Sequence, residues 1–71
     1  MIEYTVILEP GPPNWSAYVP DLPGCVAAAE TREETLDLIR EALALHLAGL
    51  RERGQEVPPA TSQAVRVTVP A

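Results

Sequence analysis

The alternation of apolar and polar positions at the start of the chain predicts a strand with one face in the core. A loop over residues 10–14, which holds three prolines and a glycine, separates this strand from a second alternating run over residues 15–19. A run of small residues at 25–29 predicts a third strand. Since the three runs are close in sequence, we expect an antiparallel meander. The first strand covers residues 2–9, with Tyr4, Val6 and Leu8 on one side and Thr5, Ile7 and Glu9 on the other.

A long amphipathic helix is predicted to follow Thr31. Its hydroxyl can cap the helix while Glu34 reaches back to the Thr31 amide, and Gly54 is placed for a left-handed stop. A helix of roughly 22 residues is about 33 Å long at 1.5 Å per residue, so it can cover only one face of a small sheet. The apolar positions recur at three- and four-residue steps: they are Leu36, Ile39, Leu43, His46 or Leu47, and Leu50, with Leu38, Ala42 and Leu45 broadening the face.

The last part of the chain is predicted to be a linker followed by a short strand. Residues 55–63 hold two adjacent prolines and polar residues without a periodic pattern. Residues 64–70 alternate three valines with Arg66 and Thr68, which predicts a strand at the sheet edge or exchanged between protomers. The expected fold is therefore a single α+β domain over residues 1–71 with the order β-β-β-α-β.

The corner between the second and third predicted strands carries a family resemblance. The run Pro20-Asp21-Leu22-Pro23-Gly24-Cys25, followed by the helix start at Thr31, resembles the amino-terminal domain of HicB-family antitoxins. The resemblance covers residue 4 to about residue 58. It implies a HicA-like toxin as partner, a small basic ribonuclease of double-stranded-RNA-binding fold that cleaves messenger RNA. HicB antitoxins often carry a carboxy-terminal DNA-binding segment. We expect none within residues 1–71, so direct nucleic-acid contact is not expected.

The net negative charge lies mostly in the first 30 residues, because all five arginines come after them. The chain has a formal net charge of −5, and its first 30 residues contain no basic side chain. This charge opposes docking on phosphate backbones and favours a basic protein partner, although acidic excess also simply keeps small proteins soluble. The ionised side chains of this region are Glu3, Glu9, Asp21 and Glu30.

The small size of the chain predicts association with other chains. A 71-residue domain buries only roughly 60% of its unfolded surface, and the single cysteine excludes an internal disulfide. We therefore expect a homodimer or tetramer. The sequence has no cationic start before an apolar run, and its longest apolar stretch, residues 42–50, is too short for a bilayer. We expect a cytoplasmic protein with no membrane partner.

The predicted partner-binding surface is the sheet face that the helix leaves open. Tyr18 and Ile7 are expected to supply buried contact area there, and the four acidic residues Glu3, Glu9, Asp21 and Glu30 to steer a basic toxin. Asp21 has a second interpretation, favoured for an aspartate in a turn: its carboxylate can accept the backbone amides of residues 22–24.

Two other functional classes stay open at the level of sequence. The first is an orphan oligomeric adaptor that has no toxin, which a missing basic neighbour in the genome would favour. The second, more remote, is a hydrolase that uses Cys25 as nucleophile and His46 as base, although no orienting third group is evident. The carboxylates match no dedicated metal-binding loop, so neither a metal nor a cofactor is expected.

Overall fold

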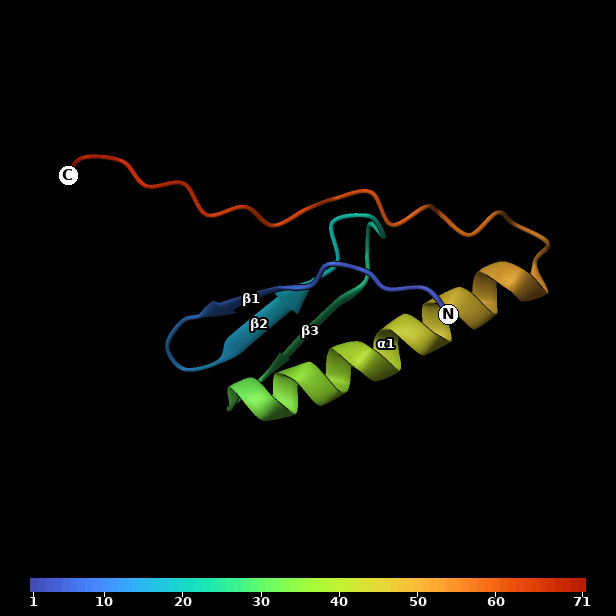
Figure 1. Ribbon diagram of the computed structural model, residues 1–71. Coiled ribbons are helices and arrows are strands. Elements are labelled where there is room, and N and C mark those ends of the chain that lie inside the picture. Colours follow the sequence, from blue (N-terminus) through green and yellow to red (C-terminus); the bar gives the residue numbers. More distant parts are fainter.

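Three short antiparallel strands and one long helix make up the computed structural model, which describes residues 1–71 (Figure 1). The sheet has the strand order β1-β2-β3, as a meander requires. The elements are β1 Ile7–Pro10, β2 Trp15–Tyr18, β3 Val26–Ala29 and α1 Arg32–Glu52. The prediction of an α+β fold with a three-stranded meander and one long helix is confirmed.

Strand β1 is shorter than the alternating pattern predicted. It begins at Ile7 rather than at residue 2. The register that sets Ile7 opposite Tyr18 would set Thr5 opposite Pro20. Pro20 has no N–H to offer, and the chain turns into the corner there, so paired strand structure stops before this point.

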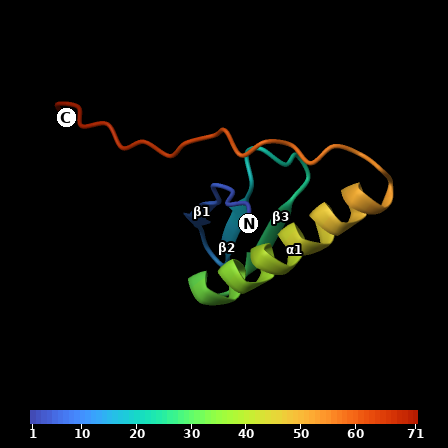
Figure 2. The ribbon, with the colours of Figure 1, turned by 45° about the vertical axis from the view of Figure 1, so that its right-hand side comes forward.

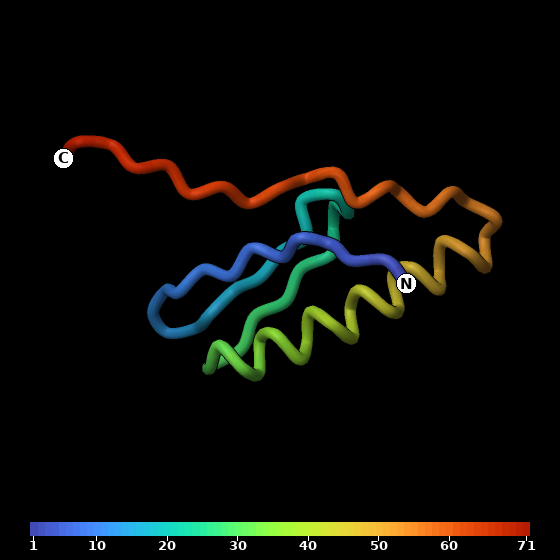
Figure 3. Tube along the Cα trace, in the orientation of Figure 1, coloured from blue at the N-terminus to red at the C-terminus, as the bar shows by residue number.

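The prediction of a short carboxy-terminal edge strand over residues 64–70 is not borne out. The chain beyond α1 is extended but pairs with no strand. The tube in Figure 3 runs past the sheet and ends far from the body of the molecule. The alternating pattern of residues 64–70 predicts a segment that can pair with a strand, but no strand of the same chain lies beside this segment.

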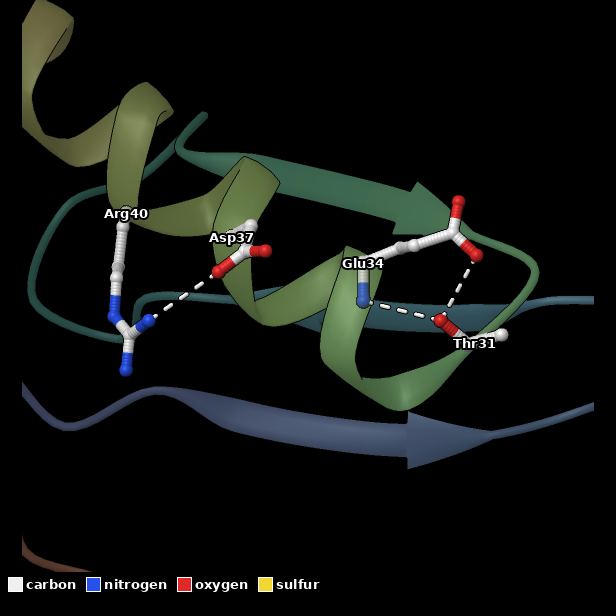
Figure 4. A network of polar contacts seen from close by, with 4 residues as sticks. All are labelled: Thr31, Glu34, Asp37 and Arg40. Atoms are coloured by element: carbon white, nitrogen blue, oxygen red, sulfur yellow. Dashed lines mark hydrogen bonds and ion pairs between the residues drawn. The ribbon is translucent and has the colours of Figure 1, made fainter.

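The two ends of α1 confirm the predicted start and stop. Thr31 Oγ1 accepts a hydrogen bond from the Glu34 backbone N–H at 3.1 Å. The Glu34 carboxylate accepts a hydrogen bond from the Thr31 hydroxyl at 2.9 Å, rather than from the Thr31 amide as expected (Figure 4). At the other end Gly54 has a φ of 68°, and the amides of Gly54 and Gln55 bond back to the carbonyls of Arg51 and Leu50. This is the Schellman arrangement, which glycine permits.

One turn further along the helix, Figure 4 also shows an ion pair between Arg40 and Asp37, 3.3 Å apart. Both side chains are mostly exposed, so the pair contributes at most about 1 kcal/mol to stability.

The core lies between α1 and the sheet and extends into the corner. Its buried apolar members are Ala17, Val19, Leu22, Cys25 and Ile39. The corner is closed by backbone hydrogen bonds, from the Leu22 amide to the Val19 carbonyl at 3.0 Å and from the Cys25 amide to the Leu22 carbonyl at 3.1 Å. This closure pins the Leu22 side chain inside the core, where apolar burial stabilises the fold.

The apolar stripe of α1 is narrower than predicted. Ile39 is fully buried, whereas Leu38 and Leu45 are 43% and 74% exposed. The narrow stripe follows from the small sheet, because three strands of four residues offer little surface to cover. The helix packs mainly against β3 and β2 and least against β1. The turned view in Figure 2 shows α1 on one side of the sheet.

Candidate partner-binding surface

A row of apolar side chains crosses the sheet face that α1 does not cover. Ile7, Tyr18 and Val26 are cross-strand neighbours in β1, β2 and β3. Because side chains alternate along a strand, they lie opposite the helix-facing Leu8, Ala17 and Ala27. Tyr18 is 41% exposed, Val26 is 63% exposed and Ile7 is half-buried. The sheet therefore presents a continuous apolar row to solvent, which we call the open-face row.

Val26 was missing from the residues predicted for this surface. It follows the buried Cys25, and in a strand the residue after a buried one points the other way. The alternation of Cys25, Val26 and Ala27 was thus the signal that could have found it. Ile7 and Tyr18, which the sequence did select, lie directly opposite one another in the register.

Three of the four predicted acidic residues are exposed near the sheet. Glu9 lies two residues from Ile7 and opposite Ser16, so it shares the open face with the open-face row. Glu3 is exposed and precedes β1, and Glu30 is exposed between β3 and the cap of α1. No ion pair engages any of the three carboxylates. Their charge is therefore available to a partner.

The fourth acidic residue, Asp21, is engaged inside the molecule. Its carboxylate accepts the Ser62 hydroxyl at 2.7 Å, the Ser62 amide at 3.0 Å and the Thr61 amide at 3.1 Å. These hydrogen bonds, the Ser62 hydroxyl first, hold the pKa of Asp21 below the ordinary value of 3.8. The proposed bonds to the amides of residues 22–24 are not formed: the Leu22 amide bonds to the Val19 carbonyl, Pro23 has no N–H, and the carboxylate accepts from Thr61 and Ser62 instead.

Two further contacts hold the same stretch of the tail. The Tyr4 hydroxyl donates to the Pro58 carbonyl, and the Thr5 hydroxyl donates to the Ser62 carbonyl at 2.9 Å. Together with Asp21 they attach residues 58–62 to the corner and to the segment before β1. The fixed part of the tail therefore ends at Ser62, and the residues after it project from the body.

Cys25 and His46, the remote catalytic pair, are in different settings. Cys25 is only 3% exposed within the core, and burial raises the pKa of its thiol. A raised pKa disfavours the thiolate that a nucleophilic cysteine needs. His46 is half-buried on α1. No pocket opens on the surface, and no three His, Cys, Asp or Glu side chains gather into a metal-binding group.

These features define a small α+β domain whose sheet is covered on one face only. Comparison with protein families then gives its membership: residues 4–70 match the family described as the HicB-like antitoxin of bacterial toxin-antitoxin systems. The match spans nearly all of the chain, so the chain belongs to this family. It includes the projecting tail, which the resemblance in the sequence had not covered.

Two relatives are similar to this chain over most of its length. An uncharacterized 14.9 kDa protein from the rep-hol intergenic region of Haemophilus phage HP1 is 33% identical over 55 residues. These are 78% of this chain but only 41% of the phage protein. A UPF0150 protein of Thermoplasma acidophilum is 28% identical over 67 residues, 93% of this chain and 97% of that protein. No solved structure matches the chain. The single helix is not long and apolar enough to span a bilayer.

Proposed function

We propose that this chain is an antitoxin that binds a small, basic, HicA-like toxin and covers the surface with which the toxin cleaves messenger RNA. Membership of the antitoxin family supports a toxin as partner. The chain would act by occlusion in the cytoplasm, where the toxin finds its messenger RNA, without catalysis and without contacting nucleic acid itself. Its net charge of −5 supports a basic protein as the ligand.

The open-face row carries the proposal. Tyr18 and Val26 are large apolar side chains exposed side by side, on a face with no covering layer. A partly exposed tyrosine flanked by aliphatic side chains is typical of an interface anchor, since its ring buries much area with few rotatable bonds. Glu9 on the same face, with Glu3 and Glu30, would steer the basic partner toward the row.

Self-association belongs to the same proposal. Only six side chains of the 71-residue chain are buried, so the isolated core is small and further burial between copies would stabilise it. A dimer or tetramer would also present more than one open-face row to toxin.

The test takes any short basic protein encoded beside this chain, purifies it as a catalytically inactive variant, and measures its affinity for this chain by calorimetry. We expect Tyr18→Ala to weaken binding by about 30-fold, as for an interface hot spot. Leu45→Ala is the matched control, because Leu45 is 74% exposed on α1 and should leave the affinity unchanged. If both variants bind like the parent chain, the open face is not the toxin-binding surface. If no neighbouring protein binds at all, an orphan adaptor is the better account.

The acidic contribution is tested by charge reversal at matched positions. The triple variant Glu3→Lys, Glu9→Lys and Glu30→Lys should slow association with the toxin, because steering acts mainly on the association rate. Asp21 is left out, since reversing it would release the tail. The control is a triple Glu→Lys variant at the exposed residues Glu41, Glu52 and Glu56, which lie on α1 or just after it. It changes the net charge by the same amount. Equal slowing by both triples would show that only net charge matters, against a local acidic surface.

A further inference from the structure

The end of the chain is an extended, apolar segment without a partner. Val65, Val67 and Val69 are 73%, 77% and 69% exposed. They alternate with Arg66 and Thr68, the period of a strand with one face buried. Figures 1 and 2 show the segment leaving the body, and the longest dimension of the molecule is 48 Å. We call residues 64–70 the valine strand.

The edge of β1 lacks a neighbour on its outer side. β1 is the first strand of the sheet order, so its outward N–H and C=O groups pair with no strand. The helix packs least against β1, and Val6 and Leu8 on its helix-facing side are only half-buried. A strand added here would complete both the hydrogen-bond ladder and the apolar layer above α1.

The charges of the two segments are complementary. If the valines lie beside Val6 and Leu8 on the helix side, alternation places Arg66 on the open face. Glu9 shares that face by the same alternation, Glu3 precedes β1, and both are exposed. Arg66 is the only charged side chain of the valine strand, and Glu3 and Glu9 are the only ones in the first ten residues. The opposite edge, β3, has only three alanines after Val26, and α1 already packs mainly against this strand.

We propose that the valine strand pairs with the free edge of β1 in a second copy of this chain, and that the exchange is reciprocal. The hydrogen bonds of Asp21 and Thr5 fix the tail up to Ser62 and direct the rest away from its own sheet. Seven residues in extended form reach about 23 Å, enough to line the edge of β1 in another molecule. The family match to residue 70 includes the valine strand, as expected if it belongs to the shared domain.

This inference rests on the self-association proposed above and specifies it. Edge pairing leaves Tyr18 and Val26 of the open-face row free for toxin, whereas Glu3 and Glu9 would serve both interactions. The first experiment measures the mass of the full chain by sedimentation over a range of concentrations, with no toxin present. The parent chain should sediment at twice its 7.7 kDa mass. Val65→Lys with Val67→Lys should give a monomer with unchanged helix content. The matched control, Ala64→Lys with Thr68→Lys, adds equal charge on the other side and should stay dimeric. A monomeric parent chain, or a dimer that survives the valine changes, would overturn the proposal.

A second experiment distinguishes exchange from closure of the tail on its own β1. Uniformly isotope-labelled chains are mixed with unlabelled chains, unfolded together and refolded. We expect nuclear Overhauser contacts from labelled valine methyls to unlabelled β1 protons. If these contacts occur only within uniformly labelled chains, the tail closes on its own sheet and exchange is excluded. Neither experiment contains toxin, so their failure would leave the antitoxin proposal to its own test.

Discussion

At the scale of single residues, the carboxylate of Asp21 joins parts of the chain that are 40 residues apart in sequence. It accepts bonds from both the backbone and the hydroxyl of Ser62, with Thr61 beside them. Hydrogen bonds to a charged acceptor are stronger than those between neutral groups. Asp21 is therefore the main polar attachment of the tail to the corner.

The attachment should depend on pH. The hydrogen bonds of Ser62 and Thr61 lower the pKa of Asp21 in the folded chain relative to the ordinary value of 3.8. A lowered carboxyl pKa favours the folded arrangement fully above the ordinary value, and this contribution is lost as pH falls through the lowered pKa. We expect the amide resonances of Thr61 and Ser62 to move toward free-peptide positions in acid, with the helix signals unchanged. The measurement is an acid titration followed by two-dimensional NMR.

Asp21→Asn is the matching variant at neutral pH. It keeps the shape of the side chain and removes the charge, so the two amides should exchange with solvent faster than in the parent chain. Glu30→Gln, which removes an exposed carboxylate that makes no hydrogen bond, should have no such effect. Unchanged exchange in Asp21→Asn would mean that Tyr4 and Thr5 hold the tail without it.

The role of Asp21 could not be obtained from the sequence. Its position in a turn indicated local hydrogen bonds to the amides of residues 22–24 as an alternative to partner contact, because turns favour aspartate, and these bonds are not formed. The bonding partners, however, lie beyond the helix, and nothing in the spacing of Asp21 and Ser62 marks them as neighbours. The exposure of Val26, by contrast, followed from local alternation and could have been found.

At the scale of elements, the stability of the domain rests on one side of α1. Ile39 is fully buried against the sheet, whereas Leu45 on the same helix is 74% exposed. Ile39→Ala should lower the free energy of unfolding by about 2–5 kcal/mol, since it removes buried methyl groups and leaves a cavity. Leu45→Ala should change it by less than about 0.5 kcal/mol. Urea unfolding followed by circular dichroism measures both, and equal losses would contradict the packing described here.

The elements differ in how well the sequence predicted them, for a physical reason. The helix was predicted with both ends, because its cap and its glycine stop are made by residues within a few positions of one another. Strand β1 was predicted too long, since its pairing depends on whether Pro20 can continue the partner strand. The valine strand was predicted from a valid pattern, but pairing also needs a neighbour, which no pattern within one segment can reveal.

At the scale of the whole molecule, the charge distribution should govern the rate at which a basic partner is found. Charged surfaces attract over a distance that shrinks from about 30 Å at 0.01 M salt to about 3 Å at 1 M. Association with the proposed basic toxin should therefore slow by at least about ten-fold over this range, while dissociation changes little. Stopped-flow fluorescence of Trp15, the single tryptophan, can follow the reaction. An association rate independent of salt would show that electrostatic attraction does not steer the partner to this chain.

The candidate surface as a whole was predicted from one geometric argument: a single helix can cover only one face of a small sheet. That argument selected Ile7 and Tyr18, and the register brings them together. It could not show that one of the four acidic residues is engaged by the tail, because charge counts carry no information on which carboxylates are already bonded.

The projecting tail also affects how quickly proteases would degrade a monomer of this protein. Proteases bind extended, unpaired backbone as their substrate. Arg66 lies in the middle of that segment, and trypsin-like proteases cleave after arginine. Cutting there would separate Val67 and Val69 from the rest. Pairing with a second copy would shield the valine strand from proteases. Because pairing increases with protein concentration, the lifetime of this protein would rise with its concentration.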